Sequence, residues 1–207
     1  MLILSRVNKK VRNALRGVLQ AYGTEHVKRR LWDSEFLQGR WNCLDDTAGD
    51  CVYLFVEKYA RQGRILDLGC GSGSTGNELD ATTYHSYIGV DVSEVALEKA
   101  RRRTEENRRQ DKNQYFQSDI LSYLPTHKFN VILYRDSIYY IPRGRITGML
   151  KRYAEYLEEG GVFLARIVSG GTSKAVVETI ESRFDVVEKY ISGQPGATVL
   201  VFRPRPG

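Results

Sequence analysis

Cysteine and long apolar runs are scarce in this sequence. Its three cysteines, Cys43, Cys51 and Cys70, form no Cys-x-x-Cys pair, so we expect neither a disulfide framework nor a metal site. No apolar run approaches the roughly 20 residues that a membrane span needs, and charges interrupt the N-terminus too often for a signal peptide. Internal repeats and low-complexity stretches are also missing. We therefore expect one compact domain in a reduced, cytoplasmic compartment.

The net charge of +6 is unevenly distributed. Residues 1–31 hold eight basic residues and one acidic residue, whereas the rest of the chain holds 23 basic and 24 acidic residues. Apolar residues recur at steps of three and four over 2–22, which predicts an amphipathic helix with a basic outer face: Leu4, Val7, Val11, Leu15, Val18 and Tyr22. The basic surplus belongs to this N-terminal segment, which argues against nucleic-acid binding by the whole protein.

From residue 64 onward, short apolar segments alternate with helical patterns. We expect strands at 64–68, 87–91, 113–117, 129–134, 160–167, 185–191 and 197–203. We expect helices at 46–61, 73–80, 93–108, 142–157 and 173–183, with Gly160 and Gly161 ending the fourth of these. Strands separated by helices predict a parallel sheet covered on both faces. Only five residues join the last two strands, so these must form an antiparallel hairpin.

Residues 64–76 are the most informative segment of the chain. An apolar strand stops at Asp67 and leads into Gly69, Gly71, Gly73 and Gly76. Glycine tolerates positive φ and lets a ligand approach the backbone, and the following helix N-terminus offers unpaired N–H groups. This arrangement predicts a loop that holds a small cofactor.

Polar residues also follow the next three predicted strands. Asp91 lies about twenty residues after the glycines, where a carboxylate can accept both hydroxyls of a ribose. Asp119, in Ser118-Asp119-Ile120, could accept a hydrogen bond from an exocyclic amine, and the strand over 129–134 turns polar at its end. Ligands of open α/β sheets bind outside the carboxyl ends of the strands, so these groups should converge.

In this order and spacing, the segments resemble the class I S-adenosylmethionine-dependent methyltransferases, over residues 64–203 at least. The resemblance is carried by 65–73, 88–93, 118–120, 129–141 and 156–164, and the final hairpin matches that family's reversed seventh strand. It implies a seven-stranded, doubly wound, mostly parallel α/β sheet with an antiparallel last strand, preceded by a helical extension. It also implies S-adenosylmethionine as cofactor and S-adenosylhomocysteine as product.

The resemblance further implies which residues contact the cofactor. The methionine part would meet the glycine loop and the segments around it: Arg40, Trp41, Asp67, Gly69, Cys70, Gly71, Gly73, Tyr134 and Arg135. The adenosine part would meet the ends of the second and third strands: Asp91, Val92, Ser118, Asp119 and Ile120. Within this set, Asp91 would hold the ribose hydroxyls and Asp119 the adenine amine.

A nicotinamide nucleotide is the alternative cofactor. Gly71-x-Gly73-x-x-Gly76 spells the dinucleotide fingerprint, with Asp91 downstream. Against this reading, Asp67 would repel a pyrophosphate that passes beside the glycines. The antiparallel last strand is also foreign to two stacked mononucleotide-binding halves. The sequence therefore favours S-adenosylmethionine.

Methyl transfer requires a positioned acceptor, exclusion of water and, for some acceptors, removal of a proton. Histidine is a frequent base, but His85 and His127 precede strands, at the opposite edge of the sheet. His26 belongs to the N-terminal segment, from which it could reach the site. For an amine acceptor we favour catalysis by proximity alone, without a base, and we favour it less for a sugar hydroxyl.

Better-placed groups follow the fourth and fifth strands, and Ser137 is among them. Asp136 and Tyr139 are the catalytic candidates, and Tyr140 and Arg166 are the candidate substrate contacts. Each has a structural alternative. Asp136 either orients an acceptor amine or hydroxyl or caps a turn, and the two tyrosines either line the pocket or pack. Arg166 either faces an anionic substrate or pairs with a neighbouring carboxylate.

The basic N-terminal helix has three readings: a lid whose apolar stripe packs on the domain, a membrane-surface anchor, or an RNA contact. RNA is the weakest, because no RNA-binding module or stacking platform is visible. We expect residues 1–62 to form a helical lid or substrate extension and residues 63–207 to form the S-adenosylmethionine-binding domain.

The resemblance implies methyl transfer, and the small size of the N-terminal cap favours a small or end-group acceptor. By analogy with family members of this minimal form, the resemblance implies transfer to an oxygen or nitrogen of a small molecule or saccharide, including precursors of cell-surface glycans. The alternative is an RNA or protein methyltransferase guided by the basic helix.

Overall fold

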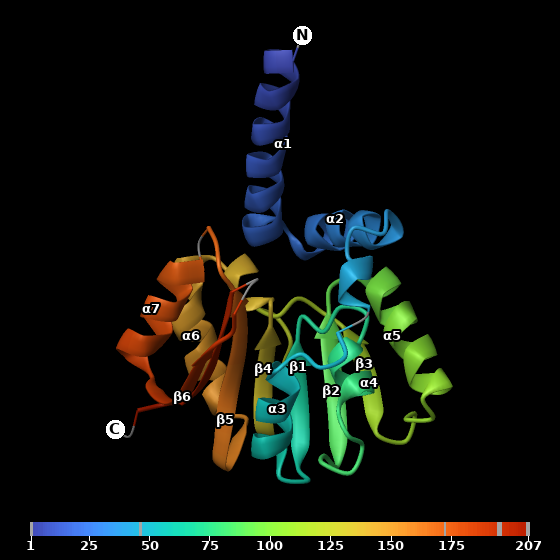
Figure 1. Cartoon of the computed structure of the whole chain (residues 1–207), viewed down its shortest axis with the longest axis vertical. Helices are drawn as coiled ribbons and strands as arrows, with labels where there is room; N and C mark the ends of the chain where they lie inside the picture. Colours follow the sequence, from blue (N-terminus) through green and yellow to red (C-terminus); the bar gives the residue numbers. More distant parts are fainter. Residues whose placement is uncertain (1, 46, 172, 194–195, 206–207) are drawn as a thin grey trace.

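A seven-stranded sheet forms the centre of the protein (Figure 1). The computed structural model describes residues 2–45, 47–171, 173–193 and 196–205, with side chains from residue 11 onward. The strand order is β3-β2-β1-β4-β5-β7-β6, and β7 is antiparallel to both of its neighbours while the other pairs are parallel. The strands are β1 Arg64–Leu68, β2 Ser86–Asp91, β3 Asn113–Gln117, β4 Phe129–Arg135, β5 Leu157–Val168, β6 Asp185–Ile191 and β7 Ala197–Arg203. The predicted fold class is confirmed.

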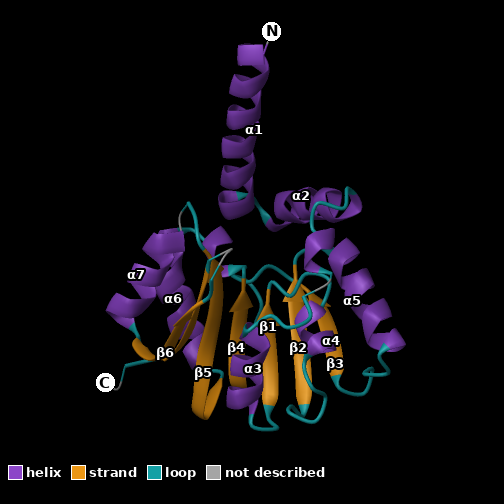
Figure 2. Cartoon of the chain, in the orientation of Figure 1, coloured by secondary structure: helices purple, strands orange, loops and turns teal. Residues whose placement is uncertain are grey.

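Helices cover both faces of this sheet and its carboxyl-terminal edge (Figure 2). One face packs against α3 Val52–Ala60, α4 Ser74–Glu78 and α5 Glu94–Glu106. The other face packs against α6 Arg143–Ala154 and α7 Ser173–Arg183. The remaining helical elements lie toward the carboxyl ends of the parallel strands: α1 Leu2–Tyr22, α2 Glu25–Leu37, η1 Asn42–Leu44 and η2 Ile138–Tyr140.

Strand β1 illustrates how alternation builds two separate cores. Leu66 and Leu68 face the core beneath α6 and α7, whereas Ile65 faces the core beneath α3 and α5. All three side chains are fully buried, which is expected for a central parallel strand. Asp67 lies on the same side as Ile65, so the fold carries a carboxylate into an apolar layer at the end of the strand.

Two helix boundaries differ from the prediction. Helix α6 ends at Ala154, and β5 already begins at Leu157 instead of residue 160. Gly160 and Gly161 do not end the helix: Gly160 adopts a φ of 72° inside the strand, next to an irregularity in the β4–β5 pairing. Helix α3 starts at Val52 and not at residue 46, which lies outside the described residues. The Val52 N–H donates to an Asp50 carboxylate oxygen.

The N-terminal region differs more strongly. The segment around the apolar cluster Leu31–Trp41 was not predicted as a helix, yet it forms α2, and the side chain of its N-cap Thr24 accepts from the Val27 N–H. Helix α1 projects from the body above the sheet (Figure 1). The expected packing of its apolar stripe on the domain is wrong, because Val11, Leu15, Val18 and Tyr22 are exposed. Within the described residues, no helix combines the length and the apolar character of a membrane span.

Candidate active site

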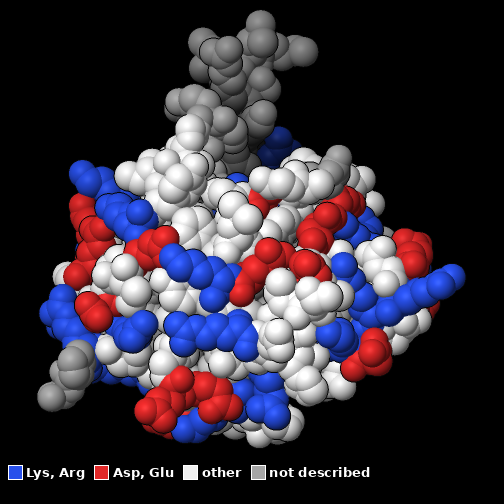
Figure 3. All heavy atoms as spheres, turned by 60° about the horizontal axis from the view of Figure 1, so that its bottom comes forward, with Lys and Arg blue, Asp and Glu red and all other residues white. Residues whose placement is uncertain are grey.

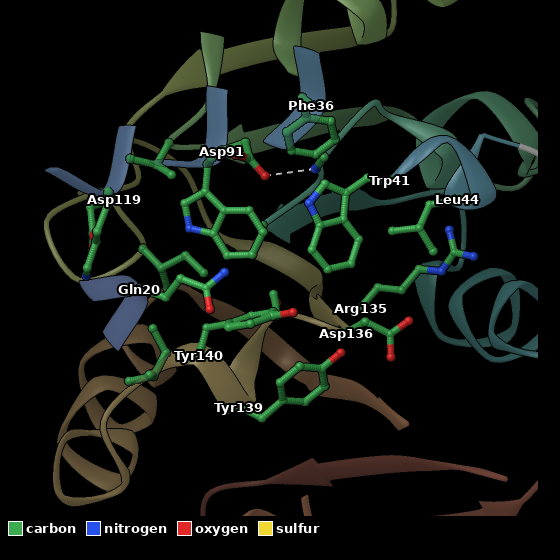
Figure 4. A pocket seen from close by; sticks show the side chains of 18 of the residues that line it. Gln20, Phe36, Trp41, Leu44, Asp91, Asp119, Arg135, Asp136, Tyr139 and Tyr140 are labelled. Atoms are coloured by element: carbon green, nitrogen blue, oxygen red, sulfur yellow. Dashed lines mark hydrogen bonds and ion pairs between the residues drawn. The ribbon is translucent and has the colours of Figure 1, made fainter. Parts of the chain in front are cut away.

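A cavity of about 410 Å³ lies at the carboxyl ends of the parallel strands, and side chains of α2 line it; Figure 4 shows it from close by. Its walls come from the ends of the strands, from both N-terminal helices and from η2: Gln20, Lys28, Trp32, Phe36, Trp41, Leu44, Gly69, Gly71, Asp91, Val92, Ser118, Asp119, Ile120, Arg135, Asp136, Ser137, Tyr139, Tyr140, Ile141, Arg166 and Val168. A smaller cavity of about 50 Å³ adjoins it and is lined by Asp67, Cys70 and Thr75 among others. The sheet changes winding direction between β1 and β4, where open α/β sheets bind ligands.

The glycine loop brings bare backbone to the cavity floor. Gly69 adopts a φ of 85°, and a Cβ there would lie 2.5 Å from the Cβ of Ser137. Gly73 adopts a φ of 73°, and a Cβ there would lie 2.7 Å from the Cβ of Ala100. Both positions therefore exclude a side chain for steric as well as conformational reasons. Gly69 and Gly71 border the large cavity, whereas Gly73 packs behind the loop against α5.

Asp91, at the end of β2, fastens this loop to the next helix. One carboxylate oxygen accepts from the Gly71 N–H at 2.9 Å, and the other accepts from the Ser93 N–H at 2.9 Å. Burial raises the pKa of Asp91 from 3.8 to about 6, although both N–H groups act in the opposite direction. A carboxylate oxygen has more than one acceptor site, so Asp91 can still receive hydroxyl donors from a ligand.

Asp67, at the end of β1, is a buried carboxylate with an open acceptor. The Tyr87 hydroxyl donates to its Oδ2 at 2.7 Å, while its Oδ1 has no hydrogen-bond partner. Burial raises the pKa of Asp67 to about 6, against the opposing effects of Tyr87 and Arg135. The fold therefore holds a weakly compensated acidic group beside the glycine loop.

Asp119 is engaged by the N-terminal extension. Lys28 of α2 donates to its Oδ2 at 2.6 Å, and the Leu121 N–H donates to its Oδ1 at 2.7 Å. Both side chains of this ion pair are about nine-tenths buried. Helix α2 is fastened a second time by Asp33, which accepts from the Ser93 hydroxyl at 2.7 Å. These contacts hold α2 over the cavity.

Two arginines and two aspartates form a mutually neutralised cluster on another wall. Asp50 accepts from Arg135 at 3.0 Å and from Arg166 at 3.0 Å, and Arg166 also pairs with Asp136. Burial acts to raise the pKa of Asp50, but the Val52 N–H and both guanidinium groups outweigh it, so this pKa is lowered. Burial raises the pKa of Asp136 despite its arginine neighbours. Of the two readings of Arg166, the structure supports pairing with carboxylates.

Four aromatic rings form one continuous wall of the cavity. The ring centroids of Trp32 and Trp41 are 5.6 Å apart, those of Trp32 and Tyr140 4.9 Å, and those of Tyr139 and Tyr140 4.9 Å. Glu35 fixes one end of this wall, since its carboxylate accepts from the Trp41 indole N–H at 3.0 Å and pairs with Arg16 of α1. The wall therefore joins α2, the start of η1 and η2.

Unpartnered polar atoms gather at this site. Among the described residues, seven buried side-chain nitrogen or oxygen atoms have no hydrogen-bond partner. Four of the seven belong to residues that line the two cavities: Gln20 Nε2, Asp67 Oδ1, Arg135 Nε and Asp136 Oδ1. Buried polar groups are normally satisfied, so this concentration indicates partners that a ligand supplies.

Most of the residues proposed from the sequence meet at these cavities. The exceptions are Arg40, Gly73 and Tyr134, which line neither cavity. Arg40 is exposed, and the Tyr134 side chain is buried in the core beneath α6, so only its backbone could contact a ligand. The three histidines also lie outside both linings, and His26 is exposed on α2.

Sequence reasoning expected the N-terminal segment to form a lid and named Ser137, but it did not identify which N-terminal side chains line the cavity. The lining residues that it did not name as site residues are Gln20, Lys28, Trp32, Phe36, Leu44, Ile141 and Val168. A signal existed for two of these, because Trp32 and Phe36 belong to the apolar cluster that precedes α3. No comparable signal existed for Gln20 and Lys28. Among the described residues, no group of three His, Cys, Asp or Glu side chains is arranged to hold a metal ion.

Known proteins share this domain. Residues 65–161 match the family described as methyltransferase domain. The ribosomal protein L11 methyltransferase of Thermoanaerobacter pseudethanolicus is 27% identical over 152 residues, which are 72% of this chain, and the match spans 46% of that relative's length. The chain thus spans about half of the length of this relative.

Solved structures share the fold at low sequence identity. Magnesium protoporphyrin IX methyltransferase from Synechocystis, solved with bound S-adenosylmethionine, has a TM-score of 0.67 at 15% identity and covers 86% of this chain and 96% of its own. N-methyltransferase NodS from Bradyrhizobium japonicum, solved with S-adenosylhomocysteine, has a TM-score of 0.62 at 17% identity, covering 74% of this chain and 86% of its own. In its domain match and its strand order, the chain is similar to the class I S-adenosylmethionine-dependent methyltransferases, and it shares their fold.

Proposed function

We propose that this protein transfers the methyl group of S-adenosylmethionine to a nitrogen or oxygen of a small molecule or saccharide. The observation that carries the proposal is Asp91, a buried carboxylate that lines the cavity and binds the glycine loop. In this assignment, Asp91 accepts from the ribose hydroxyls, and Val92 packs against adenine. The adenine amine joins Lys28 at Asp119, whose oxygens can each accept more than one donor.

The methionine part then lies along the glycine loop. Asp67 Oδ1, which has no partner, is available to the ammonium group or to a water molecule beside it. Arg135, which follows Tyr134 and has an unpartnered Nε, lines the same small cavity as Asp67. Trp41 contributes to the wall, whereas exposed Arg40 is not part of this proposal.

The charges of the cavity favour a neutral or cationic acceptor. Arg135 and Arg166 are both paired with carboxylates, so neither guanidinium group is left to neutralise an anionic substrate. The aromatic wall offers flat apolar faces of a kind that suits a sugar ring or a heterocycle. Closure by α1 and α2 limits the acceptor to a small compound or an end group.

Asp136 is the group best placed to receive the acceptor's proton. Arg166 holds one of its oxygens, while Oδ1 has no partner and belongs to a cavity-lining residue. Because burial raises its pKa, this carboxylate is a stronger base than an exposed one. In the transfer, the bond from sulfur to the methyl carbon breaks, and its electron pair stays on sulfur. The acceptor bonds to the methyl carbon and gives its proton to Asp136 Oδ1.

The proposal is tested in two steps. Calorimetry with S-adenosylhomocysteine measures cofactor binding, and transfer of labelled methyl groups to a panel of sugars, heterocyclic amines, RNA and protein identifies the acceptor. Asp136→Asn tolerates the left-handed φ of 55° at this position, so we expect an intact fold. Its cofactor affinity should be unchanged, while kcat should fall by roughly tenfold or more.

Each outcome decides a different part of the proposal. Failure to bind S-adenosylhomocysteine or S-adenosylmethionine would overturn all of it. Tight binding with transfer only to RNA or protein would overturn the acceptor class and leave the cofactor assignment standing. An unchanged kcat in Asp136→Asn would remove the proton-accepting role and favour catalysis by proximity.

A further inference from the structure

Helix α1 presents an apolar stripe that no described part of the chain covers. Val11, Leu15, Val18 and Tyr22 follow each other at steps of four, three and four, which places them on one side of an α-helix. Their exposed fractions are 60%, 57%, 54% and 68%. These are large apolar side chains left in water, although the same helix is folded against the body on another side.

The opposite side of α1 holds the helix in place. Arg16 pairs with Glu35 of α2, and Gln20 is buried in the wall of the large cavity. Successive helical residues are about 100° apart, so Gln20 lies roughly opposite Val11, Leu15 and Val18. The stripe therefore faces away from the contacts that fasten α1, and covering it requires a partner.

Charge narrows the choice of that partner. The sequence of α1 contains five basic residues and no acidic residue: Arg6, Lys9, Lys10, Arg12 and Arg16. A second copy of this helix would bring a further set of like charges to the interface, which is unfavourable. Nucleic acid would satisfy the charges but would leave the apolar stripe in water. An anionic bilayer satisfies both features together.

The rest of the molecule does not share this charge surplus. Basic and acidic side chains are intermixed on the face of the body that Figure 3 displays. The sequence agrees, since residues 1–31 carry a net charge of +7 and the rest of the chain carries −1. The basic character is therefore concentrated on the element with the exposed stripe.

We propose that α1 docks this protein on an anionic lipid surface, with the stripe entering the boundary between headgroups and acyl chains. The positive charge of Arg12 and of the basic residues before it in α1 then attracts the lipid phosphates, while Arg16 stays paired with Glu35. Since the large cavity lies at the same end of the molecule as α1, docking brings the cavity close to the bilayer (Figure 1). This proposal does not depend on the methyltransferase activity.

The test measures flotation of the full chain with lipid vesicles. Vesicles of phosphatidylglycerol mixed with phosphatidylcholine should bind the protein, and vesicles of phosphatidylcholine alone should bind it much less. Val11→Ser, Leu15→Ser and Val18→Ser combined should lower partitioning onto the anionic vesicles by roughly tenfold or more, because the stripe supplies the buried apolar area. The matched control replaces three other exposed residues, Leu54→Ser, Leu124→Ser and Ile191→Ser, and should bind like the wild type.

A second variant separates charge from apolar burial. The combined variant Lys9→Gln, Lys10→Gln and Arg12→Gln should also partition less onto anionic vesicles. The difference in partitioning between this variant and the wild type should shrink at high salt, because the Debye length falls to about 3 Å at 1 M. Equal partitioning of the stripe variant and the wild type would overturn the proposal. So would a wild-type dimer that the stripe variant converts to monomers, or binding of the wild type to RNA without binding to vesicles. Circular dichroism and thermal unfolding verify that each variant is folded.

Discussion

Replacing Asp91 by alanine separates its binding role from its folding role. In the proposed complex, the carboxylate accepts from the two ribose hydroxyls, and hydrogen bonds to a charged group contribute about 1.5–3 kcal/mol each. Loss of even one such bond corresponds to at least a tenfold weaker affinity, because tenfold is about 1.4 kcal/mol. We therefore expect Asp91→Ala to weaken S-adenosylhomocysteine binding by at least tenfold.

The effect on folding should be smaller, because two contributions oppose each other. A pKa raised from 3.8 to about 6 means that holding the charge in the ligand-free protein costs about 3 kcal/mol, at 1.36 kcal/mol per pKa unit. Alanine removes this cost but leaves the Gly71 and Ser93 N–H groups without their acceptor, at about 1–3 kcal/mol each. Asp91→Ala should therefore change the free energy of unfolding far less than the removal of one partner from a buried ion pair would.

The assay is calorimetry over a pH series, with thermal unfolding as a check on folding. Wild-type affinity should fall as the pH drops below about 6, since the protonated carboxyl loses acceptor capacity, and Asp91→Ala should show a weaker dependence. Asp111→Ala, an exposed acidic position, is the control. Folded Asp91→Ala protein that binds within twofold of the wild type would refute the reasoning.

Three further predictions follow from neighbouring groups. Asp67→Asn should stabilise the ligand-free protein above pH 6 by up to about 3 kcal/mol. The gain should vanish toward pH 4, because a raised folded-state pKa destabilises the protein only where the carboxyl group is ionised. Identical stability differences between variant and wild type at pH 4 and pH 8 would contradict this. Lys28→Met should leave Asp119 without its buried partner and loosen α2, so trypsin should cleave α2 faster than in the wild type. An unchanged cleavage rate would show that the Lys28–Asp119 ion pair does not hold the helix. Trp32→Ala should raise the KM for the acceptor and leave the cofactor affinity measured by calorimetry unchanged. A loss of cofactor affinity would instead assign Trp32 to the cofactor-binding side of the cavity.

The positions of the strands and of the carboxylates at their carboxyl ends could be predicted from local patterns. Periodicity and breaker residues lie within a few positions of each other, so the chain itself specifies where β1 stops and where the glycines begin. The topology rules then bring Asp67 and Asp91 to one edge without further information. The boundary of β5 was missed because Gly160 reads as a helix stop, yet tertiary pairing with β4 overrides that local signal.

Only the tertiary structure decided which N-terminal side chains close the site. Lys28 is separated from Asp119 by 91 positions, and nothing in the local sequence predicts that pairing. The same holds for the neutralised cluster of Asp50, Arg166 and Asp136, which changes Arg166 from a candidate anion contact into a paired group. By itself, the sequence determined the sheet, the loop and the amphipathic character of α1, because these depend on neighbours along the chain. Contacts between distant segments depend on how helices pack over the sheet edge, and that packing exists only in the folded molecule.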